Sequence, residues 1–190
     1  MSRWEPHAPE RLVAAAVDLF LERGYDRVTI TEIAQRAGLT KRTFFRHFAD
    51  KREILFGGQD AHRQVFANAI ASAPPSAKPL EAISAALAAF AAELGEERRD
   101  VLAKRQVIID GKTDLQEREL LKRAALTAAM AQSLGRRGVS EPIAGLAAEI
   151  GALAMNAAYR DWLQPDNPHT LTELSHQALR RLGAAAATLR

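Results

Sequence analysis

Residues 29–51 read TITEIAQRAGLTKRTFFRHFADK, and this segment carries the clearest structural pattern in the chain. Thr29 is followed three residues later by Glu32, which is the pattern of a capping box and predicts the start of a short helix. Gly38 ends that helix, and Thr40 is placed to cap a second short helix over residues 41–48. Two short helices joined by a tight glycine turn form a helix-turn-helix.

The residues on either side of this stretch complete a small helical domain. Residues 9–23 carry apolar side chains at the spacing of an amphipathic helix, which Gly24 ends. Asp50 and Glu53 repeat the capping pattern and predict a fourth helix from Lys51 to about residue 72, before Pro74 and Pro75. We therefore expect an N-terminal helix-turn-helix domain over residues 1–55.

The positive charge of the chain is concentrated in this domain. The net formal charge of the whole chain is +3, but residues 36–52 hold six basic residues and one acidic residue, a local charge of +5. On a helix over residues 41–48, Phe44 and Phe48 share one face and are predicted to enter the core. Arg42, Thr43, Arg46 and His47 fall on the opposite half of the helix, where they are available to a partner.

These side chains suit double-stranded DNA. Guanidinium groups bind phosphates, or guanine edges in the major groove, and threonine can meet a phosphate or a thymine methyl group. Lys51 lies in the first turn of the expected fourth helix, where a phosphate would interact favourably with both the lysine and the helix N–H groups. Arg36 carries a further positive charge that can approach phosphate.

The segment from Leu12 to Leu55, and above all residues 29–51, closely resembles the N-terminal DNA-binding domain of TetR-family transcriptional regulators. The resemblance implies that the second short helix enters the major groove, and that Thr29, Thr31, Lys41, Arg42, Thr43, His47 and Lys51 touch bases or phosphates. Family members often have tyrosine where Phe45 stands, so this chain loses a hydroxyl that can bind phosphate. With the residues proposed from charge and capping, the expected DNA-binding set is Thr29, Thr31, Arg36, Thr40, Lys41, Arg42, Thr43, Arg46, His47 and Lys51.

The composition of the 190 residues predicts an all-α protein. The chain contains 38 alanines but only 25 valines, isoleucines and threonines, which excludes a β-sandwich or barrel. The absence of cysteine excludes disulfides, thiolate metal sites and a cysteine nucleophile. Residues 1–6 lack the apolar core of a signal peptide and no window has 18 consecutive apolar residues, so we expect a cytoplasmic protein with no membrane association. No cofactor is expected.

Residues 56–190 are predicted to form a second, helical domain. After the two prolines, helices are expected over residues 79–94, 97–110, 113–134, 140–162 and 170–189. With the four preceding helices this makes about nine, the number that the resemblance implies. The resemblance also implies that the last two helices pair with those of a second copy, and that the helices before them enclose a pocket for a small-molecule effector.

The expected homodimer has two lines of support in the sequence. The helix over residues 140–162 carries many small residues, including Gly145, Ala148 and Gly151, which let another helix approach closely; packing within one chain would use them equally well. A dimer also places two DNA-reading helices at the fixed spacing of a palindromic operator. The interface is expected over about residues 140–162 and 170–189.

The effector pocket is expected where large or polar residues interrupt the alanine-rich helices. Pockets are mostly apolar with a few placed polar groups, which favours a hydrophobic or amphipathic small molecule. For each candidate a place in the ordinary core is the competing interpretation. The candidates are Phe66, Phe90, Gln106, Met130, Asn156, Tyr159 and Trp162.

The main hypothesis is therefore a homodimeric repressor that an effector releases from its operator. Activation of transcription, rather than repression, is the alternative. Effector binding is expected to move the fourth helix, from residue 51 to about residue 72, and with it the DNA-reading helices.

Two alternatives come from other features. His169, Glu173 and His176 have the spacing of metal ligands on one helical face and suggest a metal-dependent enzyme. A non-specific architectural DNA-binding protein is the other alternative, although its basic charge would be spread along the chain rather than localised.

Overall fold

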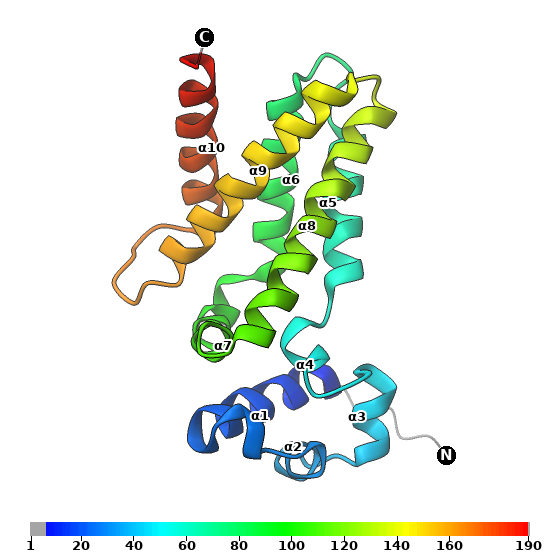
Figure 1. The fold of residues 1–190 in the computed structure, drawn as a ribbon, viewed down its shortest axis with the longest axis vertical. Coiled ribbons are helices and arrows are strands. Elements are labelled where there is room, and N and C mark those ends of the chain that lie inside the picture. The colour runs from blue at the N-terminus through cyan, green and yellow to red at the C-terminus, as the bar shows by residue number, and fades with distance from the viewer. Residues whose placement is uncertain (1–6, 190) are drawn as a thin grey trace. The chain divides into compact units, whose positions relative to one another are not determined.

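The computed structural model describes residues 7–189, and every regular element in that range is helical. The elements in chain order are α1 (Ala8–Arg23), η1 (Tyr25–Arg27), α2 (Ile30–Arg36), α3 (Lys41–His47), α4 (Glu53–Phe56), α5 (Gln59–Ser72), α6 (Pro79–Leu94), η2 (Glu96–Arg98), α7 (Arg99–Asp110), α8 (Thr113–Arg136), α9 (Glu141–Trp162) and α10 (Leu171–Ala187) (Figure 1). The all-α prediction is confirmed. The helices divide into two compact units, which are described in turn.

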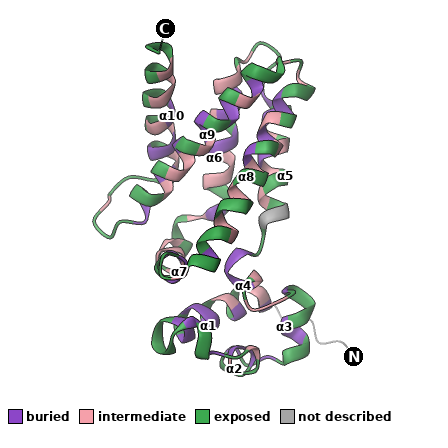
Figure 2. Ribbon diagram, in the orientation of Figure 1, coloured by how far each residue is buried: buried purple, intermediate pink, exposed green. Residues whose placement is uncertain are grey.

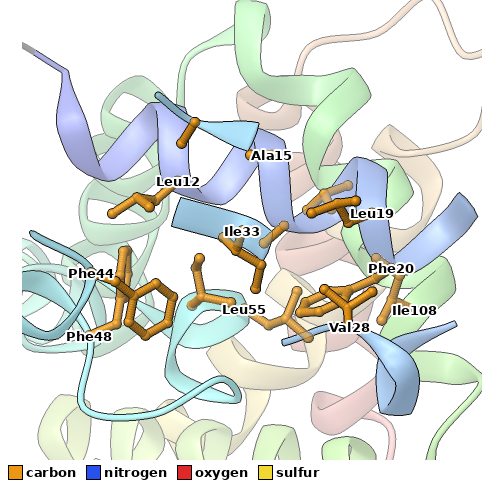
Figure 3. Packing of buried hydrophobic residues seen from close by; sticks show 14 of the residues in the cluster. Leu12, Ala15, Leu19, Phe20, Val28, Ile33, Phe44, Phe48, Leu55 and Ile108 are labelled. Atoms are coloured by element: carbon orange, nitrogen blue, oxygen red, sulfur yellow. The ribbon is translucent and has the colours of Figure 1, made fainter. Parts of the chain in front are cut away.

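The N-terminal unit combines the described residues up to Gly57 with Val101–Glu119. Its core joins Leu12 of α1, Ile33 of α2, Phe44 of α3 and Leu55 of α4 (Figure 3). The same cluster includes three side chains from the later segment, which are Ile108, Ile109 and Leu115. The expected division at residue 55 therefore misses a part of this unit, because residues 101–119 lie far away in the chain and complete its core.

Polar contacts hold residues 101–119 to the helix-turn-helix segment. The guanidinium of Arg118 pairs with the carboxylate of Glu53, with Nε 2.8 Å from Oε1. Arg105 donates to the carbonyl of Leu55, and Lys112 pairs with Asp26 in η1. The hydrogen bond from Lys112 holds the pKa of Asp26 below its ordinary value. The turn between α7 and α8 is thus bound to both the start and the end of the helix-turn-helix.

The caps predicted at the two short helices are present. Thr29 and Glu32 form a complete capping box at α2, and the hydroxyl of Thr40 accepts a hydrogen bond from the N–H of Thr43 at α3. The pattern at residues 50–53 is only half realised: Asp50 accepts from the N–H of Glu53, but the carboxylate of Glu53 pairs with Arg118. The sequence pattern predicted the position of this turn, but not the partner of Glu53.

The predicted fourth helix is interrupted. It consists of α4 and α5, separated by Gly57 with extended backbone and by Gly58 in the left-handed region at φ 82°. A Cβ at Gly57 would lie 2.8 Å from a ring carbon of Phe48, so a larger residue would displace that ring. The expectation of one helix from Lys51 to residue 72 is therefore wrong, because these glycines allow a sharp turn between two amphipathic segments.

The C-terminal unit comprises Gly58–Asp100 and the described residues from Leu120 onward. Here α6, α9 and α10 pack against one another, and α5 packs against α6 (Figure 1). The small residues of α9 serve this packing: Gly151 is buried, and a Cβ on it would lie 2.6 Å from Cγ2 of Ile83. Part of the small-residue face predicted on α9 is thus used within the chain. None of the described helices is both long and apolar enough to span a membrane.

Candidate nucleic-acid interface

Helix α3 is fixed to the N-terminal unit by its aromatic face. Phe44 is fully buried and Phe48, directly after the helix, is 7% exposed, with 5.6 Å between their ring centroids. Both rings lie in the core beside Leu55 and Leu12 (Figure 3). The prediction that these two phenylalanines are core residues is confirmed, and the opposite face of α3 must therefore point away from the core.

The outward face of α3 consists of Lys41, Phe45, Arg42 and Arg46, all of which are exposed. Figure 2 shows a large part of α3 in the green of exposed residues. At 100° per residue these four side chains follow one another around the helix in that order. Among the described residues, no hydrogen bond or ion pair engages Arg42. Three cations of α3 are therefore presented on one face, and Arg42 lies near its centre.

Two neighbours on α3 differ from the expectation. Thr43 was predicted on the outward face but is only 9% exposed, and its hydroxyl lies 3.0 Å from that of Thr40. Phe45, which the expected DNA-binding set left out, is 49% exposed. The helix angle does not account for the difference, because Thr43 and Phe45 each lie 100° from Phe44; the burial of Thr43 accompanies the contact between its hydroxyl and that of Thr40. The structure thus adds Phe45 to the candidate interface and assigns Thr43 a role in the cap.

The start of α2 presents two threonines. Thr29 and Thr31 are both exposed, and the Oε2 of Glu32 accepts hydrogen bonds from the backbone N–H of Thr29 at 2.8 Å and from its hydroxyl at 2.7 Å. These bonds hold the pKa of Glu32 below its ordinary value, so the carboxylate remains charged near neutral pH. Thr29 is therefore firstly a helix cap, and Thr31 is the freer of the two side chains.

Arg36 is already engaged within the protein. Its two terminal nitrogens lie 3.1 and 2.9 Å from the two carboxylate oxygens of Glu22, an exposed pair that links α2 to α1. The bidentate bond lowers the pKa of Glu22 and raises that of Arg36. The predicted phosphate contact of Arg36 would have to replace this pair, so the arrangement does not favour it.

Lys51 is also engaged within the protein. Its Nζ donates to the carbonyls of Tyr25 at 2.8 Å and Val28 at 3.0 Å, and lies 3.5 Å from that of Asp26. The ammonium also sits 4.4 Å from the centre of the Tyr25 ring, and its partial burial lowers the pKa of Lys51. It does not lie in a helical first turn, as predicted, because α4 begins at Glu53. Lys51 thus holds the segment between α1 and α2, because its ammonium donates to carbonyl groups of that segment.

The remaining candidates of this set stay on the surface. His47 is exposed at the end of α3, and its Nε2 lies 3.4 Å from Nε of Arg46. Thr40 is exposed at the start of α3. Thr40, Arg42, Thr43, Phe45 and Arg46 together line an open surface pocket. The site that the structure brings together is therefore the outward face of α3 with both of its ends.

The effector candidates are divided between the two units. Phe66 and Met130 are core residues of the C-terminal unit, and Phe90 packs against the same cluster with its ring centroid 5.2 Å from that of Phe66. The ring of His62, which the sequence did not single out, lies edge-on to Phe90 at 5.0 Å. Gln106 belongs to the N-terminal unit, where its side-chain amide donates to Asp110 at 2.9 Å. Gln106 therefore does not join the other candidates.

The three candidates of α9 follow one another at three-residue intervals. Asn156 has a buried side-chain oxygen without a hydrogen-bond partner. The indole of Trp162 is buried and donates to Glu96 at 2.9 Å, and its ring lies 6.0 Å from that of Tyr159. Trp162 is thus tied to the segment before α7, whereas Asn156 retains an unused acceptor.

The proposed metal ligands do not form a metal site. Among residues 7–189 no group of three His, Cys, Asp or Glu side chains is placed to hold a metal ion. His169 precedes α10 rather than sharing a face of it, and Glu173 accepts from the backbone N–H of Thr170 at 2.9 Å in a capping box. The spacing that suggested a metal site is therefore the start of a capped helix.

The geometry defines a helical protein with a helix-turn-helix domain whose second helix presents a basic face. Residues 12–56 match the family model described as "Bacterial regulatory proteins, tetR family". Residues 12–56 therefore carry a domain of the tetR family, and the relatives and solved structures that the chain resembles are transcriptional regulators.

Two relatives illustrate how the similarity is distributed along the chain. The regulator TcmR of Streptomyces glaucescens is 38% identical over 89 residues, which cover 47% of this chain and 38% of TcmR. A putative mycofactocin biosynthesis regulator, MftR of Mycobacterium tuberculosis, is 26% identical over 93% of this chain and 89% of its own length. This chain therefore spans well under half of TcmR, but most of MftR.

Solved structures extend the similarity to the whole fold. SmeT, the repressor of the Stenotrophomonas maltophilia multidrug efflux pump SmeDEF, has a TM-score of 0.57 at 22% identity over 93% of this chain and 89% of SmeT. A SmeT–triclosan complex reaches 0.65 at 21% identity over 94% and 90% of the two chains. At these identities the comparisons concern the fold alone.

Proposed function

We propose that this chain is a repressor that binds double-stranded operator DNA through α3, acting in the cytoplasm as a homodimer. The observation that carries the proposal is the outward face of α3, where Lys41, Arg42 and Arg46 are exposed while Phe44 anchors the helix in the core. A helix held in this way can enter the major groove with its cations directed at bases and phosphates. Thr40 and His47, at the two ends of α3, and Thr31 of α2 complete the proposed contact set.

The proposed dimer rests on an exposed apolar stripe along α9. Ile143, Leu146 and Leu153 are 55%, 59% and 56% exposed, and they recur at intervals of three and seven residues, so they share one side of the helix. An unpaired stripe of this kind is suited to pack against another helix of the same type. A twofold dimer formed through α9 and α10 has two symmetry-related α3 helices, one for each half-site of a palindromic operator.

The proposed effector is a small hydrophobic or amphipathic molecule that binds in the C-terminal unit. The aromatic cluster of Phe66, Phe90 and His62 offers apolar contacts, and the buried oxygen of Asn156 is an acceptor with no partner. The SmeT–triclosan complex supports this proposal, since a chain of the same fold binds a chlorinated aromatic compound. A ligand that combines an aromatic body with one hydrogen-bond donor fits these groups best.

The proposed route from effector to DNA uses the turn between α7 and α8. Helices α7 and α8 each begin in one unit and end in the other, so a shift of their C-terminal-unit segments is carried along the helix to Val101–Glu119. There Lys112 and Arg118 are paired with Asp26 and Glu53, on either side of the helix-turn-helix. A typical allosteric coupling would weaken DNA binding roughly 5- to 150-fold.

The test of DNA binding uses duplexes that the wild-type protein itself selects from a random-sequence library. We expect Arg42→Ala to weaken binding of a selected duplex by roughly 5- to 150-fold per half-site in a fluorescence anisotropy titration, because it removes a bidentate donor. Arg136→Ala is the matched control, since Arg136 is an exposed arginine of the C-terminal unit. Equal affinities of wild type and Arg42→Ala would refute the assignment of α3.

A further inference from the structure

A large apolar side chain lies in the middle of the cationic face of α3. In the described part of the N-terminal unit, Leu21, Phe45 and Val107 are the large hydrophobic side chains that stay exposed, and of these only Phe45 belongs to the helix-turn-helix. Its side chain has no polar atom, and half-exposure of a phenyl ring is unfavourable in water. A partner with an apolar group at this position would remove the exposed ring from water.

The ring of Phe45 contacts two side chains of its own helix. Its inner side meets Phe44 edge-on at 5.5 Å between centroids, and the Nζ of Lys41 lies 5.9 Å from its centre. With Thr40, Arg42, Thr43 and Arg46 it lines the open surface pocket of α3. The lining of this pocket therefore combines one phenyl ring with two guanidinium groups and two threonine side chains.

We propose that Phe45 and this pocket receive the 5-methyl group of a thymine, so that Phe45 determines which base is preferred at one position of each half-site. The inference rests on the proposed DNA binding of α3. The thymine methyl is the apolar group that the major groove displays, and a phenyl ring is a suitable contact for it. The adjacent Arg42 and Arg46 can hold a phosphate or a guanine, which fixes the register in which the ring meets the base.

The charge distribution favours this occupant over a protein or an apolar ligand. Lys41, Arg42 and Arg46 surround the ring and are exposed. The partner must therefore carry several negative charges and also one apolar group that contacts the ring. The phenyl ring lacks the hydroxyl that a tyrosine would direct to a phosphate, so its contribution has to come from apolar contact. A thymine in a duplex meets both requirements.

The test replaces individual thymines of a selected duplex by deoxyuridine, which lacks only the 5-methyl group. For wild type, we expect one thymine per half-site whose replacement weakens binding about fourfold, the effect of one methylene-sized apolar contact. For Phe45→Ala the same replacement should have no effect, while the other thymines behave as before. Phe45→Tyr keeps the ring and should retain the sensitivity.

The controls separate the two proposals. Val107→Ala changes an exposed apolar residue of the same unit outside the helix-turn-helix and should keep the wild-type response to deoxyuridine. Equal sensitivity of wild type and Phe45→Ala at every thymine, or no sensitivity in wild type, would overturn the methyl contact while DNA binding stands. If wild type selects no duplex at all, the proposed DNA binding fails, and the methyl contact fails with it.

Discussion

Single side chains decide how much of the positive charge is available to a partner. Of the six basic residues between positions 36 and 52, Arg36 is paired with Glu22 and Arg52 with Asp50, while Lys51 donates to backbone carbonyls. The other three are Lys41, Arg42 and Arg46, all on the outward face of α3. The local charge of +5 therefore includes three basic residues that are engaged within the protein and three that face outward. The two groups can be told apart only by their contacts in the structure.

The capping box at Thr29 gives a testable pH dependence. Because hydrogen bonds from Thr29 lower the pKa of Glu32 in the folded protein, its carboxylate stabilises the fold above the ordinary pKa of 4.5, and this contribution is lost as the pH falls through the folded value. We expect Glu32→Gln to reduce the loss of stability between neutral and acidic pH, measured as the urea midpoint at several pH values. Glu117→Gln, at an exposed position of α8, should leave the pH profile unchanged. A Glu32→Gln profile parallel to wild type would contradict the prediction.

Among the secondary-structure elements, local patterns predicted the ends of the short helices well. Thr29 and Thr40 cap as expected, because capping depends on residues within one turn. The capping box at Thr170 was not predicted, since its Glu173 was interpreted as a possible metal ligand. The break at Gly57 was missed because the apolar spacing continues on both sides of it. The exposure of Phe45 and the burial of Thr43 were missed because the two residues lie at equal angles from Phe44, and the pairs formed by Lys51 and Glu53 depend on residues distant in the chain.

Packing between elements predicts opposite effects for two helical glycines. Gly151→Ala places a methyl group against Ile83 and should lower the free energy of unfolding by about 1–3 kcal/mol. Gly135→Ala meets nothing within 4 Å and should leave stability unchanged or raise it by up to about 1 kcal/mol, since alanine favours the helix. Denaturant unfolding of both variants measures the difference. If Gly151→Ala were as stable as Gly135→Ala, α6 and α9 could not be packed as closely as the structure has them.

The exposed apolar stripe on α9 predicts the oligomeric state of the protein. Leu146→Glu would bury an unpaired charge in the proposed dimer and should shift the protein toward monomer in sedimentation velocity. Leu120→Glu makes the same change at a leucine of α8 that is 61% exposed, and this variant should remain dimeric. A dimer that survives Leu146→Glu would show that the stripe lies outside the interface.

The division of the molecule leads to a further prediction, because the N-terminal unit draws its core from two distant stretches of sequence. Ile109 is fully buried in the cluster that contains Leu12 and Phe44, although both of these residues lie more than 60 positions earlier in the chain. Ile109→Ala should lower stability by about 2–5 kcal/mol through loss of apolar contacts and the cavity left behind.

Hydrogen exchange should then accelerate in peptides from α1 to α4. Val107→Ala, two residues earlier on α7 at a position 64% exposed, should leave those peptides protected. If Ile109→Ala left exchange in α1 to α4 unchanged, residues 101–119 would not be part of the folded DNA-binding unit, and they could not carry the effector signal to it.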